Sequence, residues 1–301
     1  MNTPLIEASR STPSPELAAC SADLVASGSL EMSRDAAGEA RTVAALLPIG
    51  TKVYVNHSPR HSIADSLPAL LALREAGLDP VPHVAARRIH SRAEAQSFLE
   101  RATQEAGVTK VLLIGGDDPQ SRGPYEDGAA LLREGVLTRC GVRELGTPGY
   151  PEGHPRIPGA ILERALREKL ALAADQGLGT YMVTQFSFAP ARVVEYCTRM
   201  SGEFPALPIY AGLAGPTDPR TLLRFAQRCG VSAALRALKD QGMAVARLVT
   251  HTDPTEQLSA VAHYCLAHAS SNVIGVHLFS FGGATRAAAW MREALAMHEM
   301  N

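Results

Sequence analysis

The chain has 301 residues, of which 46% are hydrophobic and 20% are charged. This composition is typical of a folded globular protein and excludes disorder as the main state. The 29 lysines and arginines nearly balance the 30 aspartates and glutamates, so no bulk positive field is present to hold nucleic acid. No apolar run approaches the roughly 18 residues of a membrane span, and no secretory signal is visible. We therefore expect a cytoplasmic protein with neither nucleic acid nor a membrane as its partner.

The N-terminal part of the chain predicts a short helix. Ser14 is a suitable N-cap and Pro15 suits the first helical position. Gly28 follows an apolar pattern of helical period and would end the segment. We therefore divide the chain into residues 1–27, an N-terminal extension with a helix, and residues 28–301, the main catalytic domain.

From Gly28 onward, short β-branched runs alternate with longer segments of helical period, as in parallel α/β folds. The predicted strands lie near residues 29–32, 52–57, 80–85, 110–116, 143–150, 180–186, 207–213 and 272–280. The predicted helices between them include residues 62–76, 92–106, 160–175 and 219–229. Eight such units favour a single (β/α)8 TIM barrel over an open doubly wound sheet, since no G-x-G-x-x-G motif follows the first strand.

Polar side chains gather at the ends of the predicted strands. In a TIM barrel the carboxyl ends of the strands meet at one rim, where working residues lie. The residues at these ends are Glu31, Asn56, His57, His83, Gly116, Asp117, Asp118, Tyr150, Glu152, His154, Gln185, Gly212 and Ser280. This rim is therefore the predicted site.

Four motifs at these strand ends are distinctive in combination. They are Pro82-His83-Val84, Gly115-Gly116-Asp117, the segment Y-P-E-G-H-P at 150–155, and the segment T-Q-F-S-F at 184–188. In order and approximate spacing they resemble the methylenetetrahydrofolate reductase family, most clearly over residues 80–215. Ser29-Leu30-Glu31 looks like that family's first strand, and residues 276–279 are similar to its last strand.

The resemblance implies an oxidoreductase that interconverts 5,10-methylenetetrahydrofolate and 5-methyltetrahydrofolate, with FAD carrying the hydride and NADH or NADPH as the redox partner. It implies that Glu31 is the general acid that protonates N10 of the folate. Asp117 would act beside the flavin and the pterin, while Gln185 and Phe186 would bind the folate. The residues matching the family's FAD contacts are Asn56, His83, Gly116, Asp117, Tyr150, His154 and Lys169. Similar proteins are commonly homo-oligomers, so we expect one here.

The chemistry of the residues agrees with these roles. A glutamate that acts as an acid near neutral pH needs a pKa raised from about 4.3, which burial or a neighbouring negative charge provides. A pterin edge alternates donors and acceptors, which the carboxylate of Asp117 and the amide of Gln185 can pair with.

Two alternatives keep the folate and change the chemistry. Arg156 stands where the family has an acidic residue, and the helix leading to Lys169 lacks the Asp and Asn that commonly hold the adenosine half of FAD. A flavin-independent enzyme using NAD(P)H directly is the first alternative. Met32-Ser33 replaces the family's aromatic-proline pair after Glu31, which motivates the second, a folate-binding accessory protein with little catalysis.

Two further residue groups have competing interpretations. Glu152, His154, His83 and Asp117 are possible metal ligands, but their spacing matches no standard zinc motif and the five cysteines include no C-x-x-C pair, so we expect no metal. The basic cluster at residues 87–92 is either a solvated loop or a grip for the FAD phosphates or a folate glutamate tail.

Overall fold

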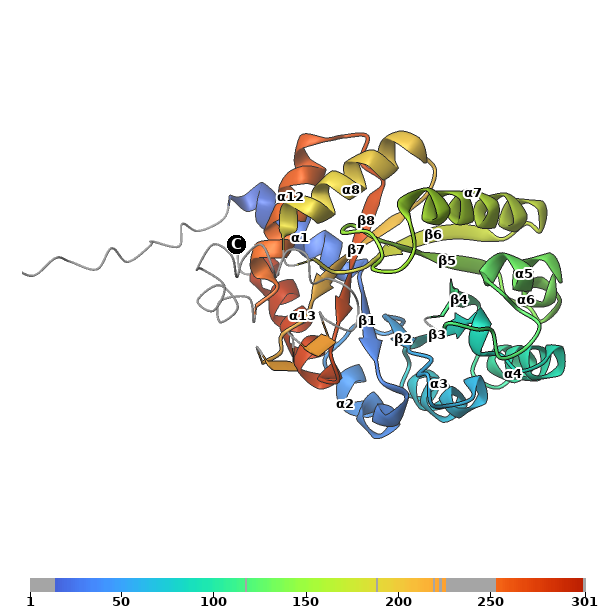
Figure 1. Ribbon diagram of the computed structural model, residues 1–301. Helices are drawn as coiled ribbons and strands as arrows, with labels where there is room; N and C mark the ends of the chain where they lie inside the picture. Colours follow the sequence, from blue (N-terminus) through green and yellow to red (C-terminus); the bar gives the residue numbers. More distant parts are fainter. Residues whose placement is uncertain are drawn as a thin grey trace, which may run out of the picture.

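Eight parallel strands close into a barrel in the computed structural model (Figure 1). The structure describes residues 14–116, 118–187, 189–218, 220–221, 224–225 and 253–299, the last range with side chains to residue 296. The strands are β1 (Ser29–Met32), β2 (Lys52–Val55), β3 (Asp79–Ala85), β4 (Lys110–Ile114), β5 (Glu144–Gly149), β6 (Gly179–Thr184), β7 (Ile209–Ala214) and β8 (Val273–Phe279). Each pairs with its neighbours in sequence, and β8 pairs with β1. The predicted (β/α)8 barrel is confirmed.

Helices surround the barrel on its outer face (Figure 1). The described α-helices are α1 (Pro15–Ala26), α2 (Ala40–Ala44), α3 (Leu67–Glu75), α4 (Arg92–Gln104), α5 (Gly128–Arg133), α6 (Val136–Arg139), α7 (Gly159–Asp175), α8 (Pro190–Glu203), α12 (Thr255–Ala267) and α13 (Ala284–Glu299). Short 3-10 turns add η1 (Arg34–Glu39), η2 (Ile63–Ser66) and η3 (Ala86–Arg88). Most of the predicted helix at residues 219–229 lies outside the described residues. Among the helices of the described ranges, none has both the length and the apolarity to cross a membrane.

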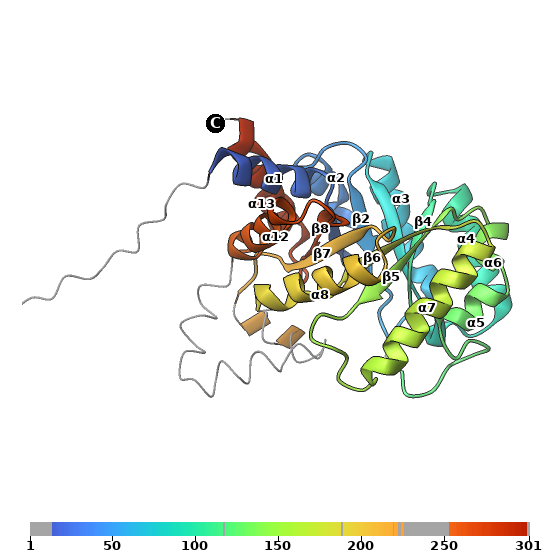
Figure 2. The same ribbon diagram turned by 90° about the horizontal axis from the view of Figure 1, so that it is seen from above.

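Helix α1 begins as the sequence predicts. The Ser14 side chain accepts a hydrogen bond from the Leu17 amide at 3.3 Å, and Pro15 occupies the first turn. The helix packs against α12 and α13, at the end of the barrel opposite the loop between β5 and α7 (Figure 2). Gly28 lies between α1 and β1. A side chain does not fit at this position, because a Cβ would lie 2.9 Å from the Val276 carbonyl oxygen. The division of the chain at residue 27 stays a prediction.

The barrel separates two cores, as strand alternation requires. An outer cluster fills the space between strands and helices, with Leu30 and Met32 of β1 among its fully buried members. An inner cluster occupies the barrel axis and consists of Tyr54, Val81, Leu112, Tyr181, Val183 and Tyr210. Three of these six side chains carry a hydroxyl group, so the barrel interior is more polar than the aliphatic interior usual in this fold.

Candidate active site at the carboxyl end of the barrel

Glu31 and Asn56 meet inside the rim of the barrel. Leu30 and Met32 are buried in the outer core, so alternation along β1 turns the intervening Glu31 inward. Asn56, the residue after β2, donates from Nδ2 to Glu31 Oε1 at 3.3 Å. Burial raises the pKa of Glu31 to about 7, although the Asn56 hydrogen bond acts in the opposite direction. A carboxyl group with this pKa exchanges a proton readily at neutral pH.

His83 lies at the height of Glu31 on the next strand but one. Glu31 is in register with Tyr54, and Tyr54 with Val81. Because the strands of such a barrel are staggered by about one residue per strand, His83, two residues beyond Val81, reaches the layer of Glu31. Burial, followed by the charges of His57 and Arg88, lowers the pKa of His83 to about 3. Its imidazole is therefore neutral at physiological pH, and its buried Nε2 has no hydrogen-bond partner among the described residues.

His277 and Ser29 form the polar floor under this layer. His277 Nδ1 and Ser29 Oγ are 2.8 Å apart and both residues are fully buried. The Tyr54 ring lies edge-on to His277, with 4.7 Å between ring centroids, and 6.0 Å from His83. Burial, with a smaller contribution from His83, lowers the pKa of His277 to about 3. The floor is therefore uncharged at neutral pH.

The segment after β4 is shaped by Gly116. Its φ is +97°, a left-handed conformation that favours glycine. Asp117 follows directly and lies outside the described residues. Asp118 accepts from Arg88 Nε at 2.7 Å and from Arg122 at 2.6 Å. Arg88 also donates to the His57 carbonyl oxygen, so this member of the basic cluster at 87–92 is already engaged in holding the loops together.

The loops after β5 and β6 are joined by side chains. The Tyr150 and His154 rings are perpendicular, with centroids 5.4 Å apart. The Ser187 hydroxyl donates to the Glu152 carboxylate, and Glu152 Oε2 is buried without a hydrogen-bond partner in the described chain. Glu152 and Ser187 belong to two separate sequence motifs, and the sequence did not predict their contact, which only the folded barrel brings about.

Gln185 and Phe186 follow β6 and lie in different environments. Gln185 is half-buried at the rim, and its Oε1 accepts from the Phe186 amide at 3.2 Å. Phe186 is buried against Phe279 and Phe281, with ring centroids 5.3 and 5.1 Å apart. Phe281 has a φ of +52°, which is unusual for a bulky residue. No sequence pattern predicted this aromatic cluster, although it contains the expected folate-binding Phe186.

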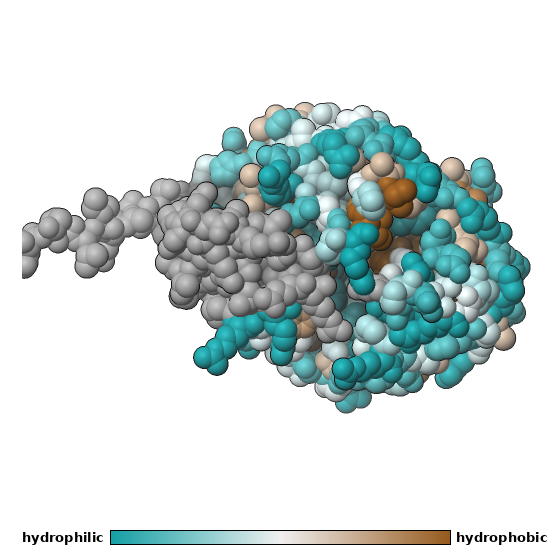
Figure 3. Space-filling view, viewed as in Figure 1, coloured by the Kyte–Doolittle hydropathy of each residue, from teal (hydrophilic) through white to brown (hydrophobic). Residues whose placement is uncertain are grey.

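The face that carries the rim is hollowed at the barrel mouth, with hydrophobic side chains gathered beside the hollow (Figure 3). An apolar hollow bordered by a few polar groups is the usual form of a small-molecule site. Glu31, Asn56, His83 and Gln185 are brought together from strands β1, β2, β3 and β6 by closure of the barrel. The rim therefore offers proton exchange by Glu31 and hydrogen bonding by Asn56, His83 and Gln185 to a bound molecule.

Lys169 is placed differently from these residues. It lies on α7, and its ammonium donates to Thr147 Oγ1 at 2.6 Å. A Cβ at the preceding residue, Gly146, would point toward the Tyr181 ring inside the barrel. Because neighbouring residues of a strand point to opposite faces, the Thr147 side chain points outward. Burial lowers the pKa of Lys169 to about 8, while Asp127 acts in the opposite direction. The Lys169 amine is thus held between the barrel and its helices. In the part of the chain that the structure describes, no group of three or more His, Cys, Asp or Glu side chains is arranged to hold a metal.

Comparison with known proteins shows a distant similarity in sequence. No family model matches the chain. A curated relative, methylenetetrahydrofolate reductase 2 of Saccharomyces cerevisiae, is 28% identical over 141 residues, which are 44% of this chain and 23% of the relative. The chain therefore spans about a quarter of that protein. The match supports a distant relationship to this reductase.

Solved structures with similar folds include three barrel enzymes. Triosephosphate isomerase from Bartonella henselae is 13% identical, with 91% of this chain and 99% of that chain covered, at a TM-score of 0.41. N-acetylneuraminate lyase from Fusobacterium nucleatum is 10% identical, with 92% and 80% covered, at 0.42. Orotidine 5'-phosphate decarboxylase from Pyrococcus horikoshii is 12% identical, with 78% and 98% covered, at 0.38. The evidence for the barrel is the strand pairing of this chain.

Proposed function

We propose that the protein is an oxidoreductase that interconverts 5,10-methylenetetrahydrofolate and 5-methyltetrahydrofolate. The observation that carries the proposal is Glu31, an inward-facing carboxyl group at the barrel mouth whose pKa is raised to about 7 by burial. The similarity to methylenetetrahydrofolate reductase 2 supports the choice of substrate. Residues 150–155 and 184–187 of these two motifs lie at the carboxyl ends of β5 and β6, at the same end of the barrel as Glu31.

Glu31 supplies the proton that the reaction needs. In the direction of reduction, the protonated carboxyl donates to N10, the C11–N10 bond breaks, and a hydride equivalent adds to C11 to give the 5-methyl group. In the reverse direction the Glu31 carboxylate takes the N10 proton back. The Asn56 amide donates to the carboxylate and stabilises its charge after proton transfer.

The neighbouring groups suit a pterin with an attached aromatic ring. The half-buried amide of Gln185 offers both donors and an acceptor to a heterocycle edge. Asp117, which would pair with the same edge, is proposed from the sequence alone. The aromatic cluster formed by Phe186, Phe279 and Phe281 supplies ring surfaces at the end of β8, next to β1 and Glu31.

The described residues suit the flavin ring of FAD, the proposed cofactor, better than its diphosphate. At the ring end, His83 offers a buried neutral nitrogen without a partner, and Gly115 leaves open space where a Cβ would stand. Of the cations that would hold the diphosphate, Lys169 donates a hydrogen bond to Thr147 and Arg88 donates one to Asp118. FAD would supply its own hydride chemistry. Both cations are already hydrogen-bonded within the protein, which leaves them less able to bind a diphosphate.

This engagement of Lys169 and Arg88 favours a second candidate, in which hydride passes directly between NAD(P)H and the folate. The role of Glu31 is the same in both versions, because N10 must be protonated whichever group supplies the hydride. The two candidates therefore differ in the cofactor and agree on the acid.

The deciding experiment combines an absorbance spectrum with turnover. Purified protein is incubated with FAD, passed through gel filtration and scanned for flavin absorption. Oxidation of 5-methyltetrahydrofolate by NAD+ or NADP+ is then assayed with and without FAD. Retained flavin that folate reduces supports the flavin enzyme. A colourless protein that turns over with a nicotinamide and gains nothing from FAD supports direct transfer.

A variant of Glu31 tests the acid separately. Glu31→Gln is expected to lower turnover by about 10² to 10⁴-fold, as loss of a positioned acid does, while folate binding measured by calorimetry persists. Glu195→Gln, on the exposed face of α8, is the matched control and is expected to retain full turnover. Folate binding with no turnover in the wild type contradicts the oxidoreductase and leaves a folate-binding protein; absence of folate binding rejects the substrate itself.

A further inference from the structure

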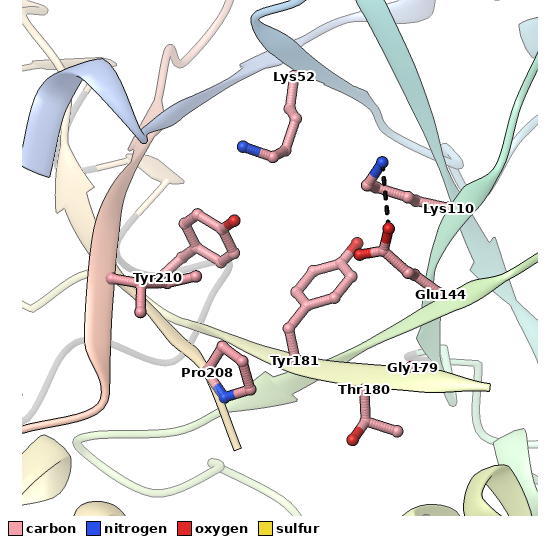
Figure 4. Close-up of a pocket in the computed structure, with 9 residues that line it drawn as sticks. Lys52, Lys110, Glu144, Gly179, Thr180, Tyr181, Pro208 and Tyr210 are labelled. Carbon is pink, nitrogen blue, oxygen red and sulfur yellow. Dashed lines mark ion pairs between the residues drawn. The ribbon is translucent and has the colours of Figure 1, made fainter. Parts of the chain in front are cut away.

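A second pocket lies at the opposite end of the barrel from Glu31. Its volume is about 150 Å³, and it is formed where β2, β4, β5, β6, β7 and β8 begin. Figure 4 shows the Lys52 amine and the Tyr210 ring on one side, and the Lys110–Glu144 ion pair on the other. Lys52 is paired with Ser29, and its amine donates to the Ser27 carbonyl oxygen, on the side of the His277–Ser29 floor away from Glu31. The pocket and the folate site are therefore separate.

The two lysines in this pocket are not equivalent. Lys110 Nζ is 3.3 Å from Asp79 Oδ2 and 3.3 Å from Glu144 Oε1, so its charge is compensated. Lys52 makes no ion pair with any described residue. Its Nζ donates to the Ser27 carbonyl oxygen at 3.2 Å and lies 5.1 Å from the centre of the Tyr210 ring. An ammonium has three donors, so Lys52 retains hydrogen-bonding capacity toward the pocket.

The environment of Lys52 favours an added negative charge. Burial is the largest influence that lowers its pKa, and the Lys110 charge adds to it, against the opposite effect of Asp79 and Glu144. A bound anion would oppose both unfavourable effects, because it restores a partner for a half-buried ammonium. Two ammonium groups line the pocket, and Lys110 is compensated by Asp79 and Glu144. A monoanion matches the single remaining charge of Lys52, whereas a dianion would be repelled by Glu144.

The remaining walls are flat and apolar. The Tyr210 ring, Pro208 and Ile274 line the pocket beside Lys52, and Ile274 is 44% exposed. Tyr181 closes the inner end, where its hydroxyl accepts from Tyr54 at 3.1 Å. A cavity of about 150 Å³ accommodates a single benzene-sized ring in other proteins. The space therefore suits a compact ring or short apolar chain attached to one charged group.

We propose that this pocket binds a small monocarboxylate with a flat apolar body, with its carboxylate on Lys52 and its body against Tyr210, Pro208 and Ile274. The proposal does not depend on folate chemistry, since it uses none of the residues at the carboxyl end of the barrel. It assigns a second ligand site to the amino-terminal end of the barrel.

Isothermal titration calorimetry with benzoate as the probe tests the proposal. We expect saturable binding of one benzoate per chain, with a dissociation constant of about 1 mM or tighter, and no binding of benzamide, which has the same shape without the charge. Lys52→Met should weaken benzoate binding at least tenfold, and Lys52→Arg should weaken it less. Arg164→Met, which removes an exposed positive charge on α7, is the control for non-specific attraction.

Two further variants locate the bound benzoate. Ile274→Trp, at an exposed position, fills the pocket without changing charge and should abolish binding. Glu31→Gln, at the other end of the barrel, should leave binding unchanged. Any of four results would overturn the proposal: no saturable binding at benzoate concentrations up to ten times the expected dissociation constant, equal binding by Lys52→Met and wild type, binding that survives Ile274→Trp, or loss of binding in Glu31→Gln. Thermal unfolding of each variant confirms that it is folded.

Discussion

Asn56 Nδ2 donates to Glu31 Oε1 at 3.3 Å and thereby links the residue after β2 to the third residue of β1. The bond favours the charged form of Glu31, while burial of the carboxyl group favours the neutral form. Burial is the larger effect, so the pKa of Glu31 is raised to about 7. This balance sets the pH at which the proposed acid changes its protonation state.

Removal of the Asn56 amide should shift the pH dependence of turnover. In Asn56→Leu the carboxylate loses a donor, so the pKa of Glu31 rises further, by about one unit if the bond is of ordinary strength for a charged acceptor. The limb of the pH–rate profile that reports Glu31 should move to higher pH by that amount. Gln96→Leu, on the exposed face of α4, should leave the profile in place. An unshifted limb in Asn56→Leu would show that the hydrogen bond does not tune the acid.

Glu31 should also lower the free energy of unfolding at neutral and alkaline pH. Its folded pKa, about 7, lies above the ordinary value of 4.5, so between these values the folded state binds more protons than the unfolded state. Stability therefore falls as pH rises from about 4.5 to 7, by about 2–3 kcal/mol from this group. Glu31→Gln removes the cost, so its melting temperature should exceed that of the wild type by several degrees at pH 8 and by less at pH 5. A pH-independent difference between the two proteins would contradict this assignment, with Glu195→Gln again as the control.

The buried histidines should have the opposite pH dependence. The folded pKa of His277, about 3, lies below the ordinary value of 6.5, so its contribution to stability is complete above pH 6.5 and is lost as pH falls toward 3. The double variant Ser29→Ala/His277→Phe removes the titrating ring together with its hydroxyl partner. Its loss of unfolding free energy between pH 7 and pH 5, measured in urea, should be about 2 kcal/mol smaller than that of the wild type. The exposed His263→Phe change should leave the wild-type difference intact.

Gly146 should be irreplaceable in the barrel interior. A Cβ at this position would lie 2.7 Å from the Tyr181 ring, and that ring is held by its neighbours in the inner cluster. Gly146→Ala should therefore destabilise the protein by about 1–3 kcal/mol, as overpacking of a core does. Gly159→Ala, at the start of α7 with no atom within 4 Å of the added methyl, is the control and should be neutral or stabilising. Equal unfolding free energies for the two variants would contradict the steric argument.

The positions of the strands were predictable because each one has a local signature. The predicted run at 29–32 coincides with β1, and the other seven predicted strands overlap their observed counterparts. The inward direction of Glu31 also follows from the sequence, since alternation between Leu30 and Met32 requires it. The N-terminal helix was predictable from Ser14 and Pro15 for the same reason, because a cap is a contact within a few residues.

Short or atypical elements were harder to predict. Helices α5 and α6 have six and four residues, too few for helical periodicity to be detected. Strand β5 contains two glycines and a proline, residues that weaken a strand. Its neighbours determine its conformation, because it pairs with β4 on one side and with β6 on the other.

The sequence by itself determined a barrel of eight βα units and a rim that carries Glu31, His83 and Gln185. Only the tertiary structure decided which side chains meet. Asn56 bonds to Glu31 across 25 positions, and Tyr54 bonds to Tyr181 across 127. Such pairs depend on the register of the strands and on closure between β8 and β1, whereas periodicity and capping act over a few residues. The contacts at the rim, in the floor and around Lys52 therefore exist only once the whole barrel has formed.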